Sequence, residues 1–566
     1  MGINTSNPLD ASDITDLAAA KEEIKRLRAV AALGANNILL LTDSYKVTHW
    51  VQYPRGTRTI YSYFESRGGK HVEVVHFGLQ YFLKRYLCGV VVTPEKIAEA
   101  EMMYSAHFGP GSVFPRDKWM YIVEHHGGKL PIHIRAPAEG TVIPYKNVLM
   151  TVENTDPKCF WLTNFLETLL VQVWYPTTVA SNSRAQMKVI KRYLMDTADK
   201  LPTGDYGEFF KLHDFGFRGV SSVETSALGA AAHLVNFRGT DTISGLVLAR
   251  DFYAAGGGEK PGAVAGYSIP ASEHSTITSW GKEGELDAFE NMLVKFPSGL
   301  VACVSDSFDI YKACGPEMWG KLKTKIINRP ADALGNPGRL VIRPDSGDPK
   351  TVDLAILEIL GETFGKRKNS KGYWVLDDHV RIIQGDGIKY ETLVEILEHL
   401  KQAGWSAENI GFGSGGGLLQ KLNRDTQKFA FKCSFIEYVD AAGQVLTRDV
   451  YKSPIDSPMK KSKKGRLTLH KLDGSEGPIV QEFLKGNDET VEYVKNTCLS
   501  DQHGWVTMQN GAGDPKTDLL QDVFLNGELV TEYSYSDIRK RAEVSDEEAA
   551  SFDLAGLLEK LGLVTE

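Results

Sequence analysis

The middle of the chain repeats one pattern, and this pattern constrains the fold more than any other feature. Short apolar runs end in Gly, Asp or Ser, and stretches with helical apolar spacing lie between them. The runs span 209–216, 240–245, 266–272, 300–306, 339–345, 381–386 and 409–414, with 428–438 as a final member. Clear helical patterns occupy 222–237, 286–296, 352–364 and 392–403. Alternating strands and helices form parallel sheets, so about eight such units predict an α/β fold of the irregular TIM-like (β/α) barrel type.

The regions on either side of this repeat show different hydrophobic patterns. Residues 131–152 alternate and turn often, as antiparallel strands do, and 163–174 has the pattern of an apolar helix. Residues 13–33 also show helical apolar spacing. The predicted domains are a helical extension over 1–36, a mixed α+β domain over 37–205 to which 439–545 returns, the barrel over 206–438, and a peripheral acidic tail over 546–566.

Composition excludes several classes of protein. The net charge of −8 argues against a nucleic-acid-binding surface. The six cysteines are widely spaced without a CxxC pair, so we expect free thiols in a reducing compartment. No apolar run approaches the ~20 residues that a membrane span needs. The first residues lack the basic start and apolar core of a signal peptide, and we expect a cytoplasmic protein.

One glycine-rich stretch, 409–424, reads NIGFGSGGGLLQKLNR. It combines a short strand, a glycine turn and the start of a predicted helix that carries Lys421 and Arg424 on one face. Backbone N–H groups at such a start bind anions, and glycine lets a phosphate approach the main chain. Taken alone, the stretch is more typical of a tight turn with a helix cap than of an anion site.

The polar motifs HDFGFRG, TD, SEHS, SDSFD, RPDSGD, QGDG and GSGGG all lie at the carboxyl ends of the predicted strands. In a barrel these ends converge on one face, where the active site lies. The candidate residues there are Phe215, Arg218, Asp241, His274, Asp309, Arg343, Asp345, Asp386, Lys421 and Arg424. Arginines and glycine loops suit phosphates, and carboxylates suit ribose hydroxyls or Mg²⁺. A phosphorylated sugar with a metal-bound diphosphate fits this set best.

Single members of this set are also compatible with purely structural roles. Arg343 before Pro-Asp is often a strand-end ion pair, Asp386 between glycines is typical of a turn, and His274 is compatible with a helix cap or a core position. The motifs of a zinc site, of a GxSxG nucleophile and of a Walker P-loop are absent.

Several motifs identify a known family. They are TDSYKVTH (42–49), YSYFESR (61–67), VENTDP (152–157), LHDFGFRGVSS (212–222), NFRGTDT (236–242), GYSIPASEHSTIT (266–278), VSDSFDIY (304–311), IRPDSGDP (342–349), QGDG (384–387), FGSGGGLLQKLNRD (412–425) and KKGRL (463–467). Together they closely resemble the nicotinamide phosphoribosyltransferase family, from about residue 37 to about 469 and again near 523–541. The family joins nicotinamide to 5-phosphoribosyl-1-diphosphate, with Mg and with ATP as co-substrate, and forms a homodimer with shared active sites.

The resemblance implies a role for each matching residue. Phe215 would stack on one face of the pyridine ring and Tyr45 of the partner subunit on the other, while Asp241 would accept the carboxamide N–H. Ser268 and Ser305 would also contact substrate, and His274 matches the family's phosphorylated histidine. The implied phosphate contacts are Arg218, Arg343 and His274; the ribose contacts are Asp345, Gly385 and Asp386; the 5′-phosphate contacts are Gly415, Gly416 and Arg424. Arg67, Lys421, Lys432, Lys452 and Lys460 would bind diphosphate and ATP, with Mg held through diphosphate and water near Asp309 and Asp345.

Two departures from the family and three rival functions remain. Ala430 replaces a frequent Ser, which would weaken one diphosphate contact, and Phe217 replaces the usual Tyr. A nicotinate phosphoribosyltransferase is the nearest rival, but Asp241 would repel a carboxylate substrate. A non-catalytic phosphate-sensing protein on this scaffold would have lost His274, Asp345 or Arg424. An aldolase would need a lysine at a strand end, which the motifs do not supply.

Overall fold

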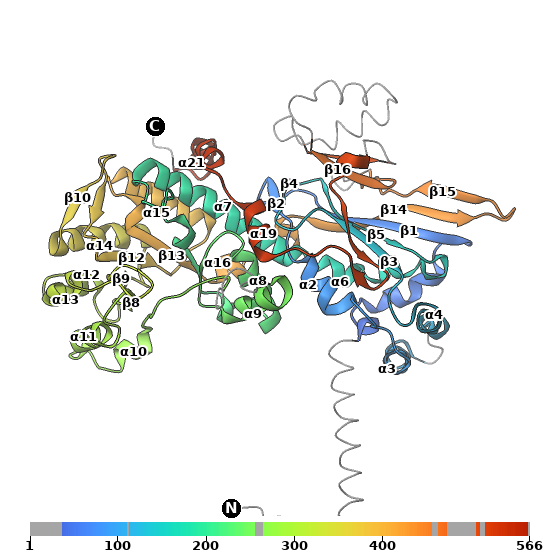
Figure 1. The fold of residues 1–566 in the computed structure, drawn as a ribbon, viewed down its shortest axis with the longest axis horizontal. Coiled ribbons are helices and arrows are strands. Elements are labelled where there is room, and N and C mark those ends of the chain that lie inside the picture. Colours follow the sequence, from blue (N-terminus) through green and yellow to red (C-terminus); the bar gives the residue numbers. More distant parts are fainter. Residues whose placement is uncertain are drawn as a thin grey trace, which may run out of the picture.

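The computed structural model describes residues 37–109, 113–254, 264–455, 462–471, 505–509 and 515–563. The predicted helix at 13–33, most of the predicted insertion at 486–517, and Lys460 lie outside these ranges. The molecule is elongated, with a parallel β/α lobe at one end and an antiparallel sheet with its helices at the other (Figure 1).

A curled parallel sheet forms the core of the first lobe and confirms the predicted fold class. Its strands follow the order β7-β6-β13-β12-β9-β8. Their bounds are β6 (Leu212–Asp214), β7 (Gly239–Thr240), β8 (Leu300–Val304), β9 (Arg339–Arg343), β12 (Val380–Gln384) and β13 (Ile410–Ser414). The segment 267–271 lies between the two edge strands, because Tyr267 bridges to Gly239 and Ala271 bridges to Ala302, both in the parallel sense. The predicted run 266–272 is therefore a pair of bridges rather than a strand, and the barrel is irregular.

Helices cover the outside of this sheet, and four of them, at 223–233, 285–295, 349–364 and 390–402, confirm the helical patterns of the sequence. The helices are α8 (Val223–His233), α9 (Ile243–Tyr253), α10 (His274–Thr278), α11 (Glu285–Lys295), α12 (Ile310–Cys314), α13 (Lys323–Ile327), α14 (Pro349–Phe364), α15 (Tyr390–Gln402) and the short α16 (Gly416–Leu419). In α15, for example, Leu393, Leu397 and Leu400 recur on one buried face, while polar residues such as Glu391 fill the other.

The second lobe contains an antiparallel sheet of order β15-β14-β1-β5-β3-β18-β19. The bounds are β1 (Thr57–Ser66), β3 (Ile132–Ala136), β5 (Val148–Asn154), β14 (Phe429–Val439), β15 (Val445–Asp449), β18 (Gln521–Leu525) and β19 (Glu528–Leu529). Its helices include η2 (Ser44–Val51), α3 (Pro94–Phe108), α4 (Arg116–His126), α5 (Leu162–Phe165) and α6 (Glu167–Val171). Smaller pairs are β2 (Glu73–Val75) with β4 (Val142–Pro144), β10 (Lys366–Lys368) with β11 (Trp374–Leu376), and β16 (Leu467–Lys471) with β17 (Trp505–Gln509).

The prediction that 428–438 closes the barrel is wrong. This run is β14, which pairs antiparallel with β1, so that Tyr63 lies opposite Lys432 and Ser66 opposite Phe429. The rings of Phe64 and Phe429 stack with centroids 5.1 Å apart. Pairing along β1 gives the side chains of this long run cross-strand partners, and such pairs stabilise a sheet.

One long helix that the sequence pattern did not predict joins the two lobes. The apolar stretch 163–174 forms α5 and α6, and α7 (Trp174–Thr197) follows. Val179 of α7 packs in the core of the antiparallel lobe, whereas Ile190 and Leu194 pack in the core of the barrel. Figure 1 shows α7 running between the lobes.

The C-terminal acidic segment was expected to be peripheral, but it packs against the barrel core. Its helices α20 (Asp546–Ala550) and α21 (Leu554–Lys560) follow α19 (Tyr535–Ala542). Ala549 is buried in the barrel core, and Glu548 pairs with the buried Arg184 of α7, with Nη2 and Oε2 2.6 Å apart. None of the helices in the described ranges combines the length and the apolarity needed to traverse a lipid bilayer.

Candidate active site

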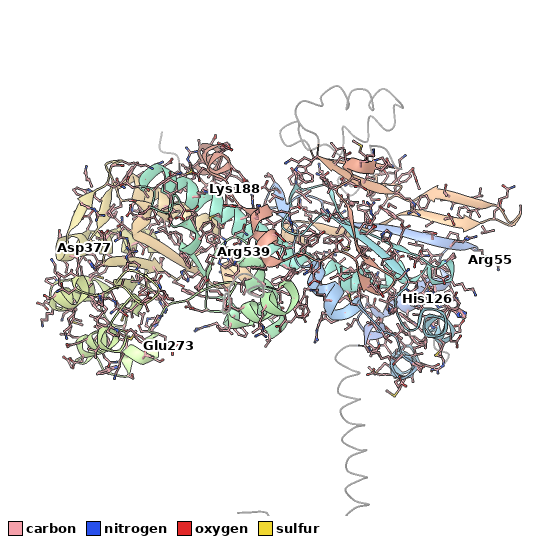
Figure 2. All side chains as sticks on the ribbon, viewed as in Figure 1. Arg55, His126, Lys188, Glu273, Asp377 and Arg539 are labelled. Carbon is pink, nitrogen blue, oxygen red and sulfur yellow. The ribbon has the colours of Figure 1, made fainter. Side chains whose placement is uncertain are left out.

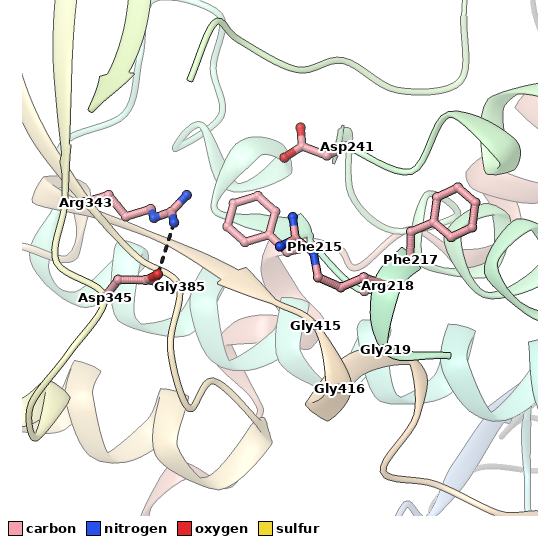
Figure 3. Close-up of a pocket in the computed structure, with 11 residues that line it drawn as sticks. Phe215, Phe217, Arg218, Gly219, Asp241, Arg343, Asp345, Gly385, Gly415 and Gly416 are labelled. Carbon is pink, nitrogen blue, oxygen red and sulfur yellow. Dashed lines mark hydrogen bonds and ion pairs between the residues drawn. The ribbon is translucent and has the colours of Figure 1, made fainter. Parts of the chain in front are cut away.

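A cavity of about 670 Å³ opens at the carboxyl ends of the parallel strands. Its walls come from the segments after β6, β7, β9, β12 and β13, which lie far apart in the sequence. The lining residues are Phe215, Gly216, Phe217, Arg218, Gly219, Asp241, Arg343, Asp345, Gly385, Gly415 and Gly416 (Figure 3). The barrel topology thus brings together much of the predicted site.

Phe215 forms an aromatic platform in this cavity. Its ring packs so closely on Gly413 of β13 that a Cβ built on that glycine would lie 1.9 Å from the ring. Gly385, which follows β12, also lies beside the ring, but a Cβ there would be in ordinary contact with it, at 3.5 Å. The ring also packs on Val341 and Ile383 in the barrel interior. Glycine at position 413 of β13 therefore makes room for a flat ring at the barrel mouth.

Asp241 presents a carboxylate beside this platform. Ser268 donates a hydrogen bond to Asp241 Oδ1, and the Asp241 N–H donates to the Asp214 carbonyl at 3.0 Å. Both Asp241 and Ser268 are exposed. Figure 3 shows Asp241 and the Phe215 ring on the same part of the cavity wall. The pair offers a hydrogen-bond acceptor next to a flat apolar face.

A chain of charged side chains extends from the cavity wall to His274. Arg343 Nη2 donates to Asp345 Oδ2 at 3.0 Å, and His274 Nδ1 lies 3.9 Å from the same oxygen. The other ring nitrogen, Nε2, lies 2.9 Å from Asp306 Oδ1, and Ser346 Oγ donates to Asp306 Oδ2 at 2.6 Å. His274 thus has a carboxylate near each ring nitrogen, with its side chain 45% exposed.

Asp306 was missed by the sequence analysis, which selected Asp309 from the same SDSFD motif. Asp309 caps α12, since its Oδ1 accepts the N–H groups of Tyr311 and Lys312 at 3.1 and 3.0 Å. Its side chain does not line the cavity. The motif contains two carboxylates, and only their positions relative to the strand end decide which one faces His274.

The glycine loop differs from the prediction in its helix. Gly415 and Gly416 line the cavity, but α16 ends at Leu419. The predicted helix face with Lys421 and Arg424 is therefore wrong: Lys421 follows the helix, and Arg424 begins the separate turn η9 (Arg424–Thr426). Both side chains are exposed.

A second group of predicted residues gathers on the antiparallel lobe and the loop that follows Lys421. Burial lowers the pKa of Lys432, and the charges of Arg67, Arg424 and Lys452 lower it further, while Glu167 opposes them. Arg67, Arg424 and Lys452 therefore lie near Lys432, and we call these four side chains the cationic surface. None of the four lines the barrel cavity.

Three further predicted residues do not reach the cavity wall. Ser305 is buried, donates to the Cys303 carbonyl at 3.0 Å and accepts from Trp319 Nε1 at 3.1 Å, which assigns its hydroxyl to barrel packing. Asp386 is exposed next to Gly385, and its N–H donates to Gln384 Oε1 at 3.1 Å. Tyr45 lies on η2 of the other lobe and is 57% exposed.

Among the described residues, the group close enough together to ligate a metal through His, Cys, Asp or Glu is His126, Asp156 and Cys159. It lies on the antiparallel lobe, far from Glu273 at the barrel mouth (Figure 2). His126 Nε2 already bonds Asp156 Oδ2 at 2.8 Å, and Tyr121 donates to the same oxygen at 2.9 Å. These bonds already join His126 and Asp156 to each other and to Tyr121.

Comparison with known proteins identifies the family to which this site belongs. A model of the nicotinate phosphoribosyltransferase (NAPRTase) family matches residues 210–527, which include the whole cavity lining. The chain belongs to this family. A model of the N-terminal domain of nicotinamide phosphoribosyltransferase matches 37–134. The resemblance drawn from the sequence motifs is thereby confirmed, and the protein is a phosphoribosyltransferase.

Similar curated proteins cover most of the chain. A protein of Xanthomonas campestris named nicotinamide phosphoribosyltransferase is 47% identical over 513 residues, which is 90% of this chain and 99% of that protein. Proteins of the same name from Acinetobacter baylyi and Mycoplasma pneumoniae are each 31% identical, over 77% and 76% of this chain and 88% and 95% of their own lengths.

Proposed function

We propose that this enzyme transfers the phosphoribosyl group of 5-phosphoribosyl-1-diphosphate to nicotinamide, and that ATP hydrolysis through a phosphorylated His274 is coupled to the transfer. The observation that carries the proposal is the placement of an aromatic platform, Phe215, beside an exposed carboxylate, Asp241, in a cavity lined by Arg218 and Arg343. The names of the similar proteins support the same substrate.

The geometry suits the chemistry of the transfer. The bond between the ribose C1 atom and the diphosphate oxygen breaks, and the pyridine nitrogen forms a bond to C1. Positive charge develops on the ribose and negative charge on the leaving diphosphate. Asp345 would stabilise the ribose, and Arg218 and Arg343, which line the same cavity, would stabilise the diphosphate. The nucleophile is a neutral ring nitrogen, so no general base is needed and positioning is the main task.

Asp241 supports nicotinamide over nicotinate. Its free acceptor sites suit the two N–H donors of a carboxamide, and Ser268 holds one carboxylate oxygen in place. A nicotinate carboxylate at the same position would face a like charge. Nicotinate remains the second candidate because the matching family model is named for that substrate.

His274 has the surroundings of a phosphoryl acceptor. A hydrogen bond between Nε2 and Asp306 would place the ring proton on that nitrogen and leave the Nδ1 lone pair free to attack the γ-phosphorus of ATP. The bond from phosphorus to the bridging oxygen would break and ADP would leave. Asp306, fixed by Ser346, would stabilise the charged imidazole that results.

A shared site between two subunits would complete the cavity. Within one chain the platform has Phe215 on one side, while Tyr45 and the cationic surface of Arg67, Arg424, Lys432 and Lys452 lie outside the cavity. We infer that a second copy supplies them in a homodimer, so that Tyr45 covers the other ring face and the cations bind diphosphate and ATP. Lys460 and Lys421 would extend this surface.

Oxygen donors near His274 fit Mg²⁺, since Asp306 and Asp345 are carboxylates within one charged chain. When bound, the ion would neutralise the phosphate charges. Asp345 would then hold it through water and diphosphate, with Asp309 at the edge of the site. The negative net charge and the five cysteines of the described ranges, all of them free thiols, support a cytoplasmic enzyme without a nucleic-acid partner.

The deciding experiment measures product formation from nicotinamide and from nicotinate, each with 5-phosphoribosyl-1-diphosphate and with or without ATP. We expect nicotinamide mononucleotide and diphosphate in equal amounts, with a stimulation by ATP. Faster formation of the nicotinate product would support the second candidate, and no product from either base would refute both.

A further inference from the structure

Asp214 is buried behind the cavity and bonds to both of the loops that carry Phe215 and Asp241. It is the last residue of β6 and is 0% exposed, so it cannot touch a ligand. Its Oδ1 accepts the N–H of Gly216 at 2.7 Å, and its Oδ2 accepts the hydroxyl of Thr240 at 3.1 Å. Its main-chain carbonyl accepts the N–H of Asp241 at 3.0 Å.

These bonds join the loop of the platform to the loop of the acceptor. Gly216 follows Phe215 directly, and Thr240 precedes Asp241 directly. The strands β6 and β7 pair only through His213 with Gly239 and Asp214 with Thr240, so the ladder between them is very short. The Asp214 side chain therefore supplies a large part of the connection between the loops.

A carboxylate fits this position better than an amide. The groups that face the Asp214 side chain are donors, a backbone N–H and the hydroxyls of Thr240 and Thr242, and a carboxylate can accept from all of them. The Thr240 oxygen also accepts the N–H of Thr242 at 2.9 Å, which extends the network into the start of α9. Burial raises the pKa of Asp214, and the bond from Gly216 opposes this rise.

We propose that Asp214 is a positioning residue for substrate choice: its side chain sets the separation between the Phe215 ring and the Asp241 carboxylate, and so allows one ligand to stack and to donate its carboxamide N–H at the same time. The inference rests on the proposed function.

The test compares nicotinamide with 3-acetylpyridine, which has a similar shape but lacks the N–H donor. We expect the wild-type enzyme to prefer nicotinamide by about 10- to 100-fold in kcat/KM, as for a hydrogen bond to a charged group. Asp214→Ala should reduce this preference to within about threefold of unity, because Asp241 then no longer reaches the carboxamide of a stacked ring. If the substitution weakened only the ring platform, kcat/KM would fall by the same factor for both compounds, and the ratio of the two values would stay constant.

Two milder variants keep the test decisive if Asp214→Ala does not fold. Thr240→Val keeps a similar side-chain volume but removes the bond to Asp214 and the acceptor of the Thr242 N–H. Asp214→Asn keeps one acceptor oxygen and replaces the other with a donor. Each should lower the ratio by about three- to tenfold, with a smaller loss of stability. Preservation of the wild-type ratio in both folded variants would overturn the proposal.

A matched control separates this role from general stability. Glu208 is 2% exposed and lies in η5 (Glu208–Phe210), the turn that precedes β6, where it pairs with Lys191 at 3.3 Å. Glu208→Gln should lower the melting temperature without changing the ratio. A drop in the ratio in this control equal to that of Thr240→Val would also refute the assignment. If the wild-type enzyme makes no product from nicotinamide, the proposed function fails first, which a single assay of the unmodified protein reveals.

Discussion

The contact between Phe215 and Gly413 yields the sharpest prediction. In Gly413→Ala the new Cβ would lie 1.9 Å from Phe215 Cε2, 2.2 Å from Cδ2 and 2.7 Å from Cζ. Carbon atoms in contact are normally about 3.5–4.0 Å apart, so the ring must move by about 1.5 Å or more. The strand cannot yield instead, because β13 pairs with both β6 and β12.

The displacement of the Phe215 ring predicts how much activity is lost. A misplacement of about 1 Å in a positioned reaction can cost about 100-fold, so kcat/KM for nicotinamide should fall by at least about 100-fold. This fall corresponds to about 2.7 kcal/mol of transition-state stabilisation. Overpacking of the barrel interior should also lower the free energy of unfolding by about 1–3 kcal/mol.

The control lies on the same strand. Gly411 faces the same side as Gly413, and the atoms nearest to a Cβ there, Ile383 Cγ1 and the Lys211 carbonyl oxygen, lie 4.0 Å away. Initial rates with varied nicotinamide should therefore show Gly411→Ala within about threefold of wild type. A folded Gly413→Ala enzyme with the kinetics of Gly411→Ala would refute the reasoning. Adding Phe215→Ala to Gly413→Ala should restore stability, because removing the ring removes the clash.

The remaining predictions concern substrate choice, ATP and assembly. Asp241→Asn should lose most of the preference for nicotinamide over nicotinate, as an amide can donate to nicotinate; an unchanged ratio of kcat/KM values would mean that Asp241 only shapes its turn. His274→Ala should abolish acid-labile labelling by γ-labelled ATP and leave slow transfer without ATP, and labelling that persists would exclude His274 as the acceptor. Mixing inactive Tyr45→Ala and Phe215→Ala proteins should restore activity through hybrid sites; no recovery after demonstrated subunit exchange would argue against a shared site.

Much of the cavity lining was predictable from the sequence, because each lining residue belongs to a short motif beside its own strand. Each strand end carries its own motif, and parallel β/α topology places these ends on one face. Phe215, Asp241, Arg343 and Gly415 could therefore be assigned to one site before any contact was known. Their sequence signal is the polar or glycine residue that directly follows an apolar run.

Long-range pairing explains what the sequence analysis missed. The run 428–438 has the apolar character of a barrel strand, yet it pairs along β1, which lies more than 350 residues earlier in the chain. Strand propensity does not name a partner, since the energy comes from side-chain pairs across the ladder. The selection of Asp306 over Asp309 has the same origin, because it depends on which carboxylate the strand end turns toward His274.

By itself, then, the sequence determined the alternation of strands and helices, the motifs at the strand ends and the family, since hydrophobic period and turn chemistry act between near neighbours. The tertiary structure alone decided that β14 leaves the barrel, that α7 joins both cores, and that the cationic surface around Lys432 lies outside the Phe215 cavity. These features arise from contacts between residues that are distant in the chain, and such contacts form only when the whole chain has packed.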